Sequence, residues 1–260
     1  MNIIFIESTV ITHIGLVRGN NEDNYFINGI CKTDNKVTVE GYEDNRERDT
    51  YLYAVFDGMG GERYGEKASM IAAKSLIEYI STDVRRTVGE YIRRANKLIC
   101  DEIVRNNGVR SGTTLALLYI RDNKVISYNI GDSRTYLFRK GDLYLLSEDH
   151  TEVQRLINMR KIDEESARHH KSKNRLTQHL GIFPDEMRIE PYVSKEVRLK
   201  SNDILMVCSD GLTDMVCDDD IGDIMAREDL DASGIAKELA ATAQDNGGRD
   251  NTTVIVVKII

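Results

Sequence analysis

Residues 51–61, with the sequence YLYAVFDGMGG, constrain the fold more than any other part of the chain. The first six are aromatic, aliphatic or alanine, a composition typical of a buried strand. The strand pattern stops at Asp57, and three glycines follow within four residues. Because glycine lets the backbone approach a ligand closely, we expect the Asp57 carboxylate to lie at a strand end beside a binding site.

Two further aspartates lie at the ends of apolar runs. Asp210 closely follows the run ILMVC, and Asp250 shortly precedes the run TTVIVV. An isolated Asp-Gly pair is more often a plain surface turn. Three acids at strand ends, taken together, favour one shared site over three unrelated turns.

The composition limits the classes of ligand. The chain has 260 residues, a formal net charge of −8 and a pI near 5.3. This charge argues against non-specific binding to nucleic acid or to an anionic membrane. No apolar run is long enough to span a bilayer. The first residues lack a basic region and include Glu7, so we expect no signal peptide and a cytoplasmic location.

Several other chemistries lack their sequence signatures. The four cysteines form no C-x-x-C pair, and none is followed six residues later by arginine, as the phosphate loop of a cysteine-dependent phosphatase requires. The five histidines form no H-E-x-x-H motif, and no G-x-x-x-x-G-K-[ST] loop occurs. These signatures therefore give no support to a zinc, redox, cysteine-phosphatase or nucleoside-triphosphate site.

Hydrophobic periodicity predicts strands and helices without a linker between domains. Strands are predicted over residues 9–17, 25–27, 51–56, 113–120, 124–130, 134–138, 143–146, 191–199, 203–208 and 252–260. Helices are predicted over residues 68–79, 84–103, 218–226 and 233–245. Blocks of strands with pairs of helices favour an α+β fold.

Three segments have weaker or more specific signals. Short turn signals between residues 113 and 146 indicate a four-stranded antiparallel meander. Residues 31–50 are polar and charged, which predicts a loop or a poorly packed hairpin tip. Residues 148–181 are highly charged with weak apolar periodicity, so we expect a partly mobile excursion over the surface.

The three aspartates offer hard oxygen ligands, which suit Mg²⁺ or Mn²⁺. Asp57 can bridge two ions, and Gly58 can add its carbonyl oxygen. Two ions about 3.5–4 Å apart lower the pKa of a shared water and hold both ends of an in-line displacement, which suits hydrolysis of a phosphate ester. The phosphate oxygens also need a cation, and Arg18, four residues before Glu22, is the candidate.

Seven segments carry a resemblance to a known family: GLVRGNNEDNY (15–25), AVFDGMGG (54–61), SGTTLAL (111–117), YNIGDSRTYLFRKGDLYLLSEDHT (128–151), ARHHKSKNRLTQHLG (167–181), DILMVCSDGLTDMV (203–216) and GGRDNTTVIVV (247–257). With them the chain resembles the metal-dependent protein serine/threonine phosphatases of type 2C, the PPM phosphatases, in their compact bacterial branch. The segments occur in family order and span nearly the whole chain. One segment alone is a weak signal, but seven in order are a strong one.

The resemblance implies a single catalytic domain over residues 1–260. Its fold would be a four-layer α-β-β-α sandwich, with two central antiparallel sheets flanked by helices. Residues 148–184 would form a flap beside the catalytic cleft. The activity would be hydrolysis of phosphoserine and phosphothreonine in proteins by in-line attack of a water activated by two Mn²⁺ or Mg²⁺ ions.

The resemblance also implies a role for each site residue. The direct ligands of the two ions would be Asp57 as the bridge, the Gly58 carbonyl, Asp210 and Asp250. Waters on the ions would be held by Glu22 and Asp23, and the phosphate by Arg18. A third, weaker ion would be held by Asp132 together with Asp210.

One departure from the family affects the mechanism. Many eukaryotic members have histidine directly after the Asp-Gly pair, in a proposed general-acid role, and this chain has Met59 there. A thioether cannot donate a proton to the leaving seryl or threonyl oxygen. The hypothesis from the sequence is that a water on the third ion does so, which makes Asp132 important for turnover.

Other interpretations remain open. A turn, a cap or a solvated charge would account singly for residues 20–23, Arg18, Asp132, Asp210 and Asp250. His169 and His170 are adjacent and would point apart on a strand, so we interpret them as packing residues of the flap. The chain could also be a silent regulatory relative, or a hydrolase of small phosphate esters. We favour the phosphatase, because the structural interpretations together require many coincidences.

The sequence says little about partners. By analogy with bacterial relatives, phosphorylated proteins are the expected substrates, with a cognate serine/threonine kinase or a phosphorylated anti-sigma-factor antagonist as candidate partners. We expect a monomer.

Overall fold

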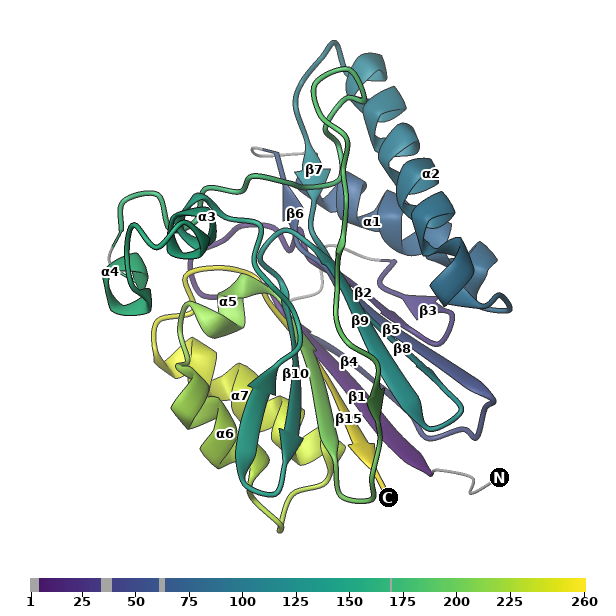
Figure 1. Ribbon diagram of the computed structural model, residues 1–260, viewed down its shortest axis with the longest axis vertical. Coiled ribbons are helices and arrows are strands. Elements are labelled where there is room, and N and C mark those ends of the chain that lie inside the picture. The colour runs from purple at the N-terminus through teal and green to yellow at the C-terminus, as the bar shows by residue number, and fades with distance from the viewer. Residues whose placement is uncertain (1–4, 34–38, 61–63, 169) are drawn as a thin grey trace.

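The computed structural model describes residues 5–33, 39–60, 64–168 and 170–260 (Figure 1). Two antiparallel sheets lie face to face, and helices cover the outer face of each sheet. The predicted α+β fold with a four-layer α-β-β-α sandwich is therefore confirmed. Gly61 of the glycine-rich turn and His169 of the flap lie outside the described residues.

Six strands form one sheet, in the order β11-β10-β14-β15-β1-β4. In that order their bounds are Asp142–Leu145, Arg134–Arg139, Ile204–Cys208, Thr252–Ile259, Ile6–His13 and Val39–Asp44. Every neighbouring pair is antiparallel. Strand β15 is buried along seven of its eight residues, which explains why its sequence is a continuous apolar run.

Seven strands form the other sheet, in the order β12-β9-β8-β5-β2-β3, with β13 also paired to β9. In the same order, with β13 last, their bounds are Tyr192–Val193, Lys124–Ile130, Leu115–Arg121, Thr50–Phe56, Asn24–Ile27, Ile30–Cys31 and Val197–Arg198. A separate pair, β6 (Gly58–Met59) and β7 (Gly112–Thr113), continues from the end of β5.

The helices complete the layers. The seven-stranded sheet is covered by α1 (Gly65–Leu76), the 3₁₀ helix Ile77–Tyr79 and α2 (Val84–Arg105), and the six-stranded sheet by α6 (Asp218–Met225) and α7 (Ala232–Asp245). Helix α5 (Asp210–Thr213) follows β14 directly, while α3 (Glu152–Asn158) and α4 (Glu164–Arg168) lie outside the layers. Among the described residues, no helix is long and apolar enough to cross a membrane.

Strand β5 is buried on both faces. Tyr53 and Val55 point into the core between the sheets, and Leu52 and Phe56 into the core beneath α1 and α2. This alternation follows from the two-residue period of a strand. Burying each such side chain contributes roughly 1.5–3 kcal/mol. The end of β5, where Asp57 follows, is therefore fixed firmly in the molecule.

The predicted meander is wrong at one connection. β8 pairs with β9 and β10 with β11, but β9 and β10 belong to different sheets. Between them Gly131 has φ +97, and a Cβ there would lie 2.6 Å from Cγ2 of Thr114. The short Gly131-Asp132 turn, which the sequence analysis interpreted as part of the meander, thus lies where the chain crosses between the sheets. Local turn chemistry does not specify which strand is the partner.

The boundaries also differ at other segments. The strand predicted over residues 191–199 is two short strands, β12 and β13, separated by residues 194–196. The predicted loop over residues 31–50 contains β4, which pairs with β1 and extends the six-stranded sheet. Its polar sequence fits a strand at the edge of a sheet, where one side is exposed. The strand predicted over residues 9–17 ends at His13, because the chain leaves the sheet there toward the candidate site.

The crossing at Gly131 should be sensitive to substitution. We expect Gly141→Ala, at φ +92 with no atom within 4 Å of the added carbon, to cost about 1–2 kcal/mol through backbone strain alone. Gly131→Ala should cost a further ~1–3 kcal/mol, because its methyl group also collides with Thr114. Urea unfolding of both variants measures the difference, and equal losses would contradict this account of the crossing.

Candidate metal centre

The proposed site residues come together at one edge of the sandwich, where strands of both sheets begin or end. Asp57 follows β5, Asp210 follows β14 and Asp250 precedes β15. The connection from β1 to β2 brings Arg18 and its neighbouring acids to the same edge. The crossing from β9 to β10 brings Asp132 there too, from the point at which the predicted meander fails.

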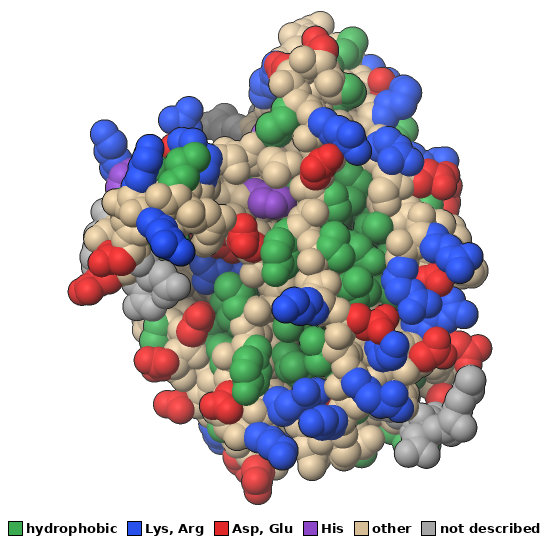
Figure 2. Space-filling view, in the orientation of Figure 1, with side chains coloured by type: hydrophobic (Ala, Val, Ile, Leu, Met, Phe, Trp, Pro, Cys, Tyr) green, Lys and Arg blue, Asp and Glu red, His purple; other side chains and the backbone are tan. Residues whose placement is uncertain are grey.

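A cleft of about 980 Å³ opens at this edge. Seven of the eight residues predicted from the sequence line it: Arg18, Glu22, Asp57, Gly58, Asp132, Asp210 and Asp250. Figure 2 shows acidic side chains in the hollow between the main body and the projecting segment that carries α3, in the same orientation as Figure 1. The cleft therefore concentrates negative charge.

Carboxylates in the cleft oppose each other's ionisation. Burial raises the pKa of Asp57 well above its ordinary value, and the charges of Asp210, Asp23 and Asp132 raise it further. Burial, followed by the charges of Asp210 and Asp149, does the same to the pKa of Asp132. Burial raises the pKa of Asp210 to about 6. An added cation would relieve this repulsion.

Asp23, the eighth predicted residue, lies beneath the cleft and is only 1% exposed. Its Oδ2 accepts hydrogen bonds of 2.7 Å from the hydroxyls of both Ser209 and Thr253. Its Oδ1 is buried and has no hydrogen-bond partner among the described residues. Burial raises the pKa of Asp23 to about 7. The unpaired oxygen makes a cation or a water a suitable neighbour.

Arg18 is the one cationic side chain from the predicted set. Its Nη2 lies 2.5 Å from Oδ2 of Asp250, and 53% of the side chain is exposed. This contact raises the pKa of Arg18, so the guanidinium is charged at every relevant pH. Its exposure at the cleft leaves it accessible to an anion such as phosphate.

Position 58 requires glycine for a steric reason. A Cβ at this position would lie 2.3 Å from the carbonyl oxygen of Gly65 and 2.5 Å from that of Glu22. The backbone of the Asp57-Gly58 turn is thereby pressed against the start of α1 and against the loop that carries Glu22. Only glycine permits this approach.

Two side chains that the sequence analysis did not single out hold the site in place. Asn251 accepts a 2.7 Å hydrogen bond from the backbone of Glu22, and its amide donates to the carbonyls of Ile14 and Asn20. The backbone N–H of Asp57 donates to Oγ1 of Thr114 over 2.9 Å. Both residues lie inside segments quoted for the family resemblance, which was the available signal.

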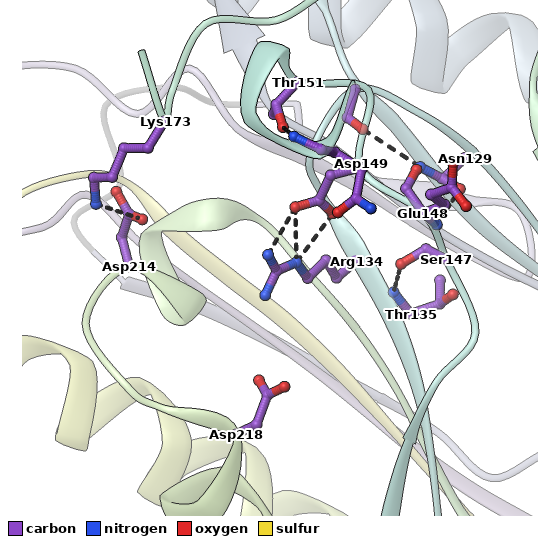
Figure 3. Close-up of polar contacts among 12 residues, drawn as sticks. Asn129, Arg134, Thr135, Ser147, Glu148, Asp149, Thr151, Lys173, Asp214 and Asp218 are labelled. Atoms are coloured by element: carbon purple, nitrogen blue, oxygen red, sulfur yellow. Dashed lines mark hydrogen bonds and ion pairs between the residues drawn. The ribbon is translucent and has the colours of Figure 1, made fainter. Parts of the chain in front are cut away.

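The flap segment provides a further wall of the cleft through Asn174, Arg175, Leu176 and His179. Figure 3 shows how it is attached: Arg134 donates three hydrogen bonds to the carboxylate of Asp149, of 2.7, 3.0 and 3.2 Å. Further along the same segment, Lys173 contacts Asp214 at 3.1 Å. The sequence analysis singled out none of these cleft-lining side chains individually.

The donor set fits a hard divalent cation. Carboxylates and a carbonyl converge on the cleft, and these are oxygen ligands of the kind that Mg²⁺ and Mn²⁺ prefer. In their present rotamers, however, no three His, Cys, Asp or Glu side chains of the described ranges converge on one point. Asp250 is turned to Arg18 instead. Binding of an ion by three of these side chains would therefore involve side-chain rotation.

Comparisons with known proteins show the family of the chain. The model of the family Protein phosphatase 2C matches residues 18–252. Serine/threonine phosphatase stp of Listeria monocytogenes is 31% identical over 259 residues, covering 95% of this chain and 93% of the relative. Protein phosphatase PhpP of Streptococcus pneumoniae is 31% identical over 264 residues, covering 98% of both proteins.

A solved structure of a serine/threonine protein phosphatase is also similar to this chain. The catalytic domain of the serine/threonine protein phosphatase PstP, in complex with two manganese ions, is similar with a TM-score of 0.79, 27% identity and 99% coverage of both chains. The family expected from the seven sequence segments is thus confirmed. This chain belongs to the Protein phosphatase 2C family and is a protein serine/threonine phosphatase.

Proposed function

We propose that this phosphatase hydrolyses phosphoserine and phosphothreonine by in-line attack of a water activated by two divalent ions in the cleft. The observation that carries the proposal is the convergence of Asp57, Asp210 and Asp250 on one cleft with Arg18 at its side. A pair of Mn²⁺ or Mg²⁺ ions, when bound there, supplies the Lewis acidity that activates the water.

The residues of the chain would divide the remaining work. Asp57 would bridge the ions, and the Gly58 carbonyl, Asp210 and Asp250 would complete their direct ligands. Arg18 would hold the phosphate oxygens with its planar guanidinium, released from Asp250 when that carboxylate turns to an ion.

Glu22 and Asp23 would accept hydrogen bonds from waters on the ions. Glu22 lines the cleft, and Asp23 has a buried oxygen without a partner among the described residues. Asp132, beside Asp210, would hold a third and weaker ion. The manganese-bound relative supports Mn²⁺ as the first ion to test, with Mg²⁺ as the alternative.

Several broader points belong to the same proposal. Residues 1–260 would form one catalytic domain with a flap at about residues 148–184, and the protein would act as a cytoplasmic monomer. Its substrates are phosphorylated proteins, since that is what its relatives are named for. A cognate serine/threonine kinase or a phosphorylated anti-sigma-factor antagonist is the proposed partner.

The decisive variant is Asp57→Asn, which keeps the side-chain shape and removes the bridging charge. Wild type should hydrolyse a phosphothreonine peptide with Mn²⁺ or Mg²⁺ and lose the activity in EDTA. The variant should lose at least ~10³-fold in kcat, because the ions lose their shared ligand. Asp245→Asn, an exposed residue at the end of α7, is the matched control. A folded wild type without activity in either metal would refute the proposal.

Arg18→Lys tests the phosphate contact. Lysine keeps the positive charge but loses the two-pronged geometry, so we expect kcat/KM for the peptide to fall about 10–100-fold. Arg249→Lys, an exposed neighbour outside the cleft, should change nothing. Steady-state kinetics with saturating Mn²⁺ measure both variants, and equal kcat/KM values for wild type and Arg18→Lys would exclude a phosphate-binding role.

Asp132→Ala tests the third ion. Titration calorimetry with Mn²⁺ should lose the weakest binding event, while the two tighter ions bind nearly as before. The reason is that Asp132 belongs to the third site, whereas Asp57 and Asp250 belong to the first two. Weaker binding of all ions in this variant would instead place Asp132 in the main centre.

A further inference from the structure

Hydrolysis of a seryl or threonyl phosphate needs a proton donor. The leaving oxygen would depart as an unstable alkoxide, and a positioned acid accelerates such a step by about 10²–10⁴-fold. Met59, the residue after the Asp57-Gly58 pair, has no proton to give. The donor is then either a water, as the sequence hypothesis has it, or another side chain of the cleft.

His179 lines the same cleft as Arg18, Asp57 and Met59. The backbone beside it is tied to β7, because Thr113 and Leu180 exchange two hydrogen bonds, of 3.0 and 2.9 Å. Strand β7 in turn pairs with β6, in which Met59 lies opposite Gly112. One strand therefore separates His179 from the residue that follows the catalytic Asp-Gly pair.

The imidazole of His179 has a defined orientation. Its Nδ1 lies 2.9 Å from the carbonyl oxygen of Leu180. A carbonyl oxygen only accepts, so Nδ1 carries a hydrogen, and the second proton of the charged ring is on Nε2. Nε2 makes no hydrogen bond within the described residues and is available to a ligand.

The imidazole ring of His179 packs against Gly112. A Cβ at this position would lie 2.4 Å from Nδ1 of His179, so the imidazole packs directly on the backbone of β7. A side chain held in this way loses little freedom when a substrate binds, which is the condition for efficient proton transfer.

We propose that His179 is the general acid of this phosphatase and donates its Nε2 proton to the leaving seryl or threonyl oxygen. The proposal rests on the phosphatase function proposed above. The water oxygen forms a new bond to phosphorus while the phosphorus–oxygen bond to the side chain breaks. The leaving oxygen keeps the bonding electron pair and takes the proton, giving alcohol, phosphate and neutral imidazole. The water releases one proton to solvent, and the imidazole recovers one from solvent.

The surroundings affect how readily the ring is charged. Burial lowers the pKa of His179, and the hydrogen bond to Leu180 opposes this effect. Arg110 also lowers the pKa, while Glu186 raises it. A bound phosphate dianion would favour the charged ring, because an opposite charge stabilises it. Substrate binding and protonation of His179 therefore support each other.

The test compares two leaving groups in His179→Gln and His179→Ala, with saturating Mn²⁺. A phosphothreonine peptide releases an alkoxide that needs a proton, whereas p-nitrophenyl phosphate releases a stable phenolate. We expect the ratio of kcat for the peptide to kcat for p-nitrophenyl phosphate to fall about 10²-fold in both variants. Partial misfolding lowers both rates equally, so the ratio reports only the chemistry. His170→Gln, in the flap but outside the cleft, should leave the ratio unchanged.

The outcomes separate the proposals. A ratio in His179→Gln equal to that of wild type would overturn the role of His179, even if both rates fell. Asp132→Ala measured alongside tests the rival donor, a water held through Asp132. A selective loss with the peptide in that variant, and none in His179→Gln, would favour the water. A wild type that hydrolyses no phosphothreonine peptide would refute the proposed function, and the role of His179 with it.

Discussion

The crowding of carboxylates at one edge of the sandwich is the constraint on which the site depends. Burial and mutual repulsion raise the pKa of Asp57, Asp132 and Asp210 above their ordinary values. At neutral pH such groups oppose folding, because the unfolded chain would ionise them freely. The cost is tolerated where a divalent cation can offset it. This cluster is therefore a candidate cation-binding site, and the stability of the protein should increase when a divalent cation binds there.

The remainder of the molecule holds these charges in place. The hydrophobic cores packed against the two faces of β5 fix the strand that directly precedes Asp57. The hydrogen bonds of Asn251 and Thr114 fix the loops around it. Residues 174–176 and His179 add a wall to the cleft, and the segment that carries them is bonded to the body of the molecule at Asp149 and at Lys173. Catalytic sites need such rigid support, because small displacements of a positioned group cost large factors in rate.

Much of this could be predicted from the sequence, because its signals are local. The apolar run before Asp57, the helical periods around residues 68–103 and the final strand all correspond to elements of the structure. The identity of the candidate ligands followed from acids at strand ends and from the order of seven segments. Carboxylate chemistry then indicated Mg²⁺ or Mn²⁺, since ligand type depends on residue type alone.

The sequence by itself thus determined the fold class and the family, and it indicated the chemical nature of the candidate site. Only the tertiary structure decided that β9 and β10 lie in different sheets, that Asp23 lies beneath the cleft, and that His179 lies in its wall. The physical reason is that these facts depend on contacts between segments far apart in the chain. A turn signal gives the direction of the chain but not the partner of the next strand, and a histidine outside any motif acquires a role only from its neighbours in space.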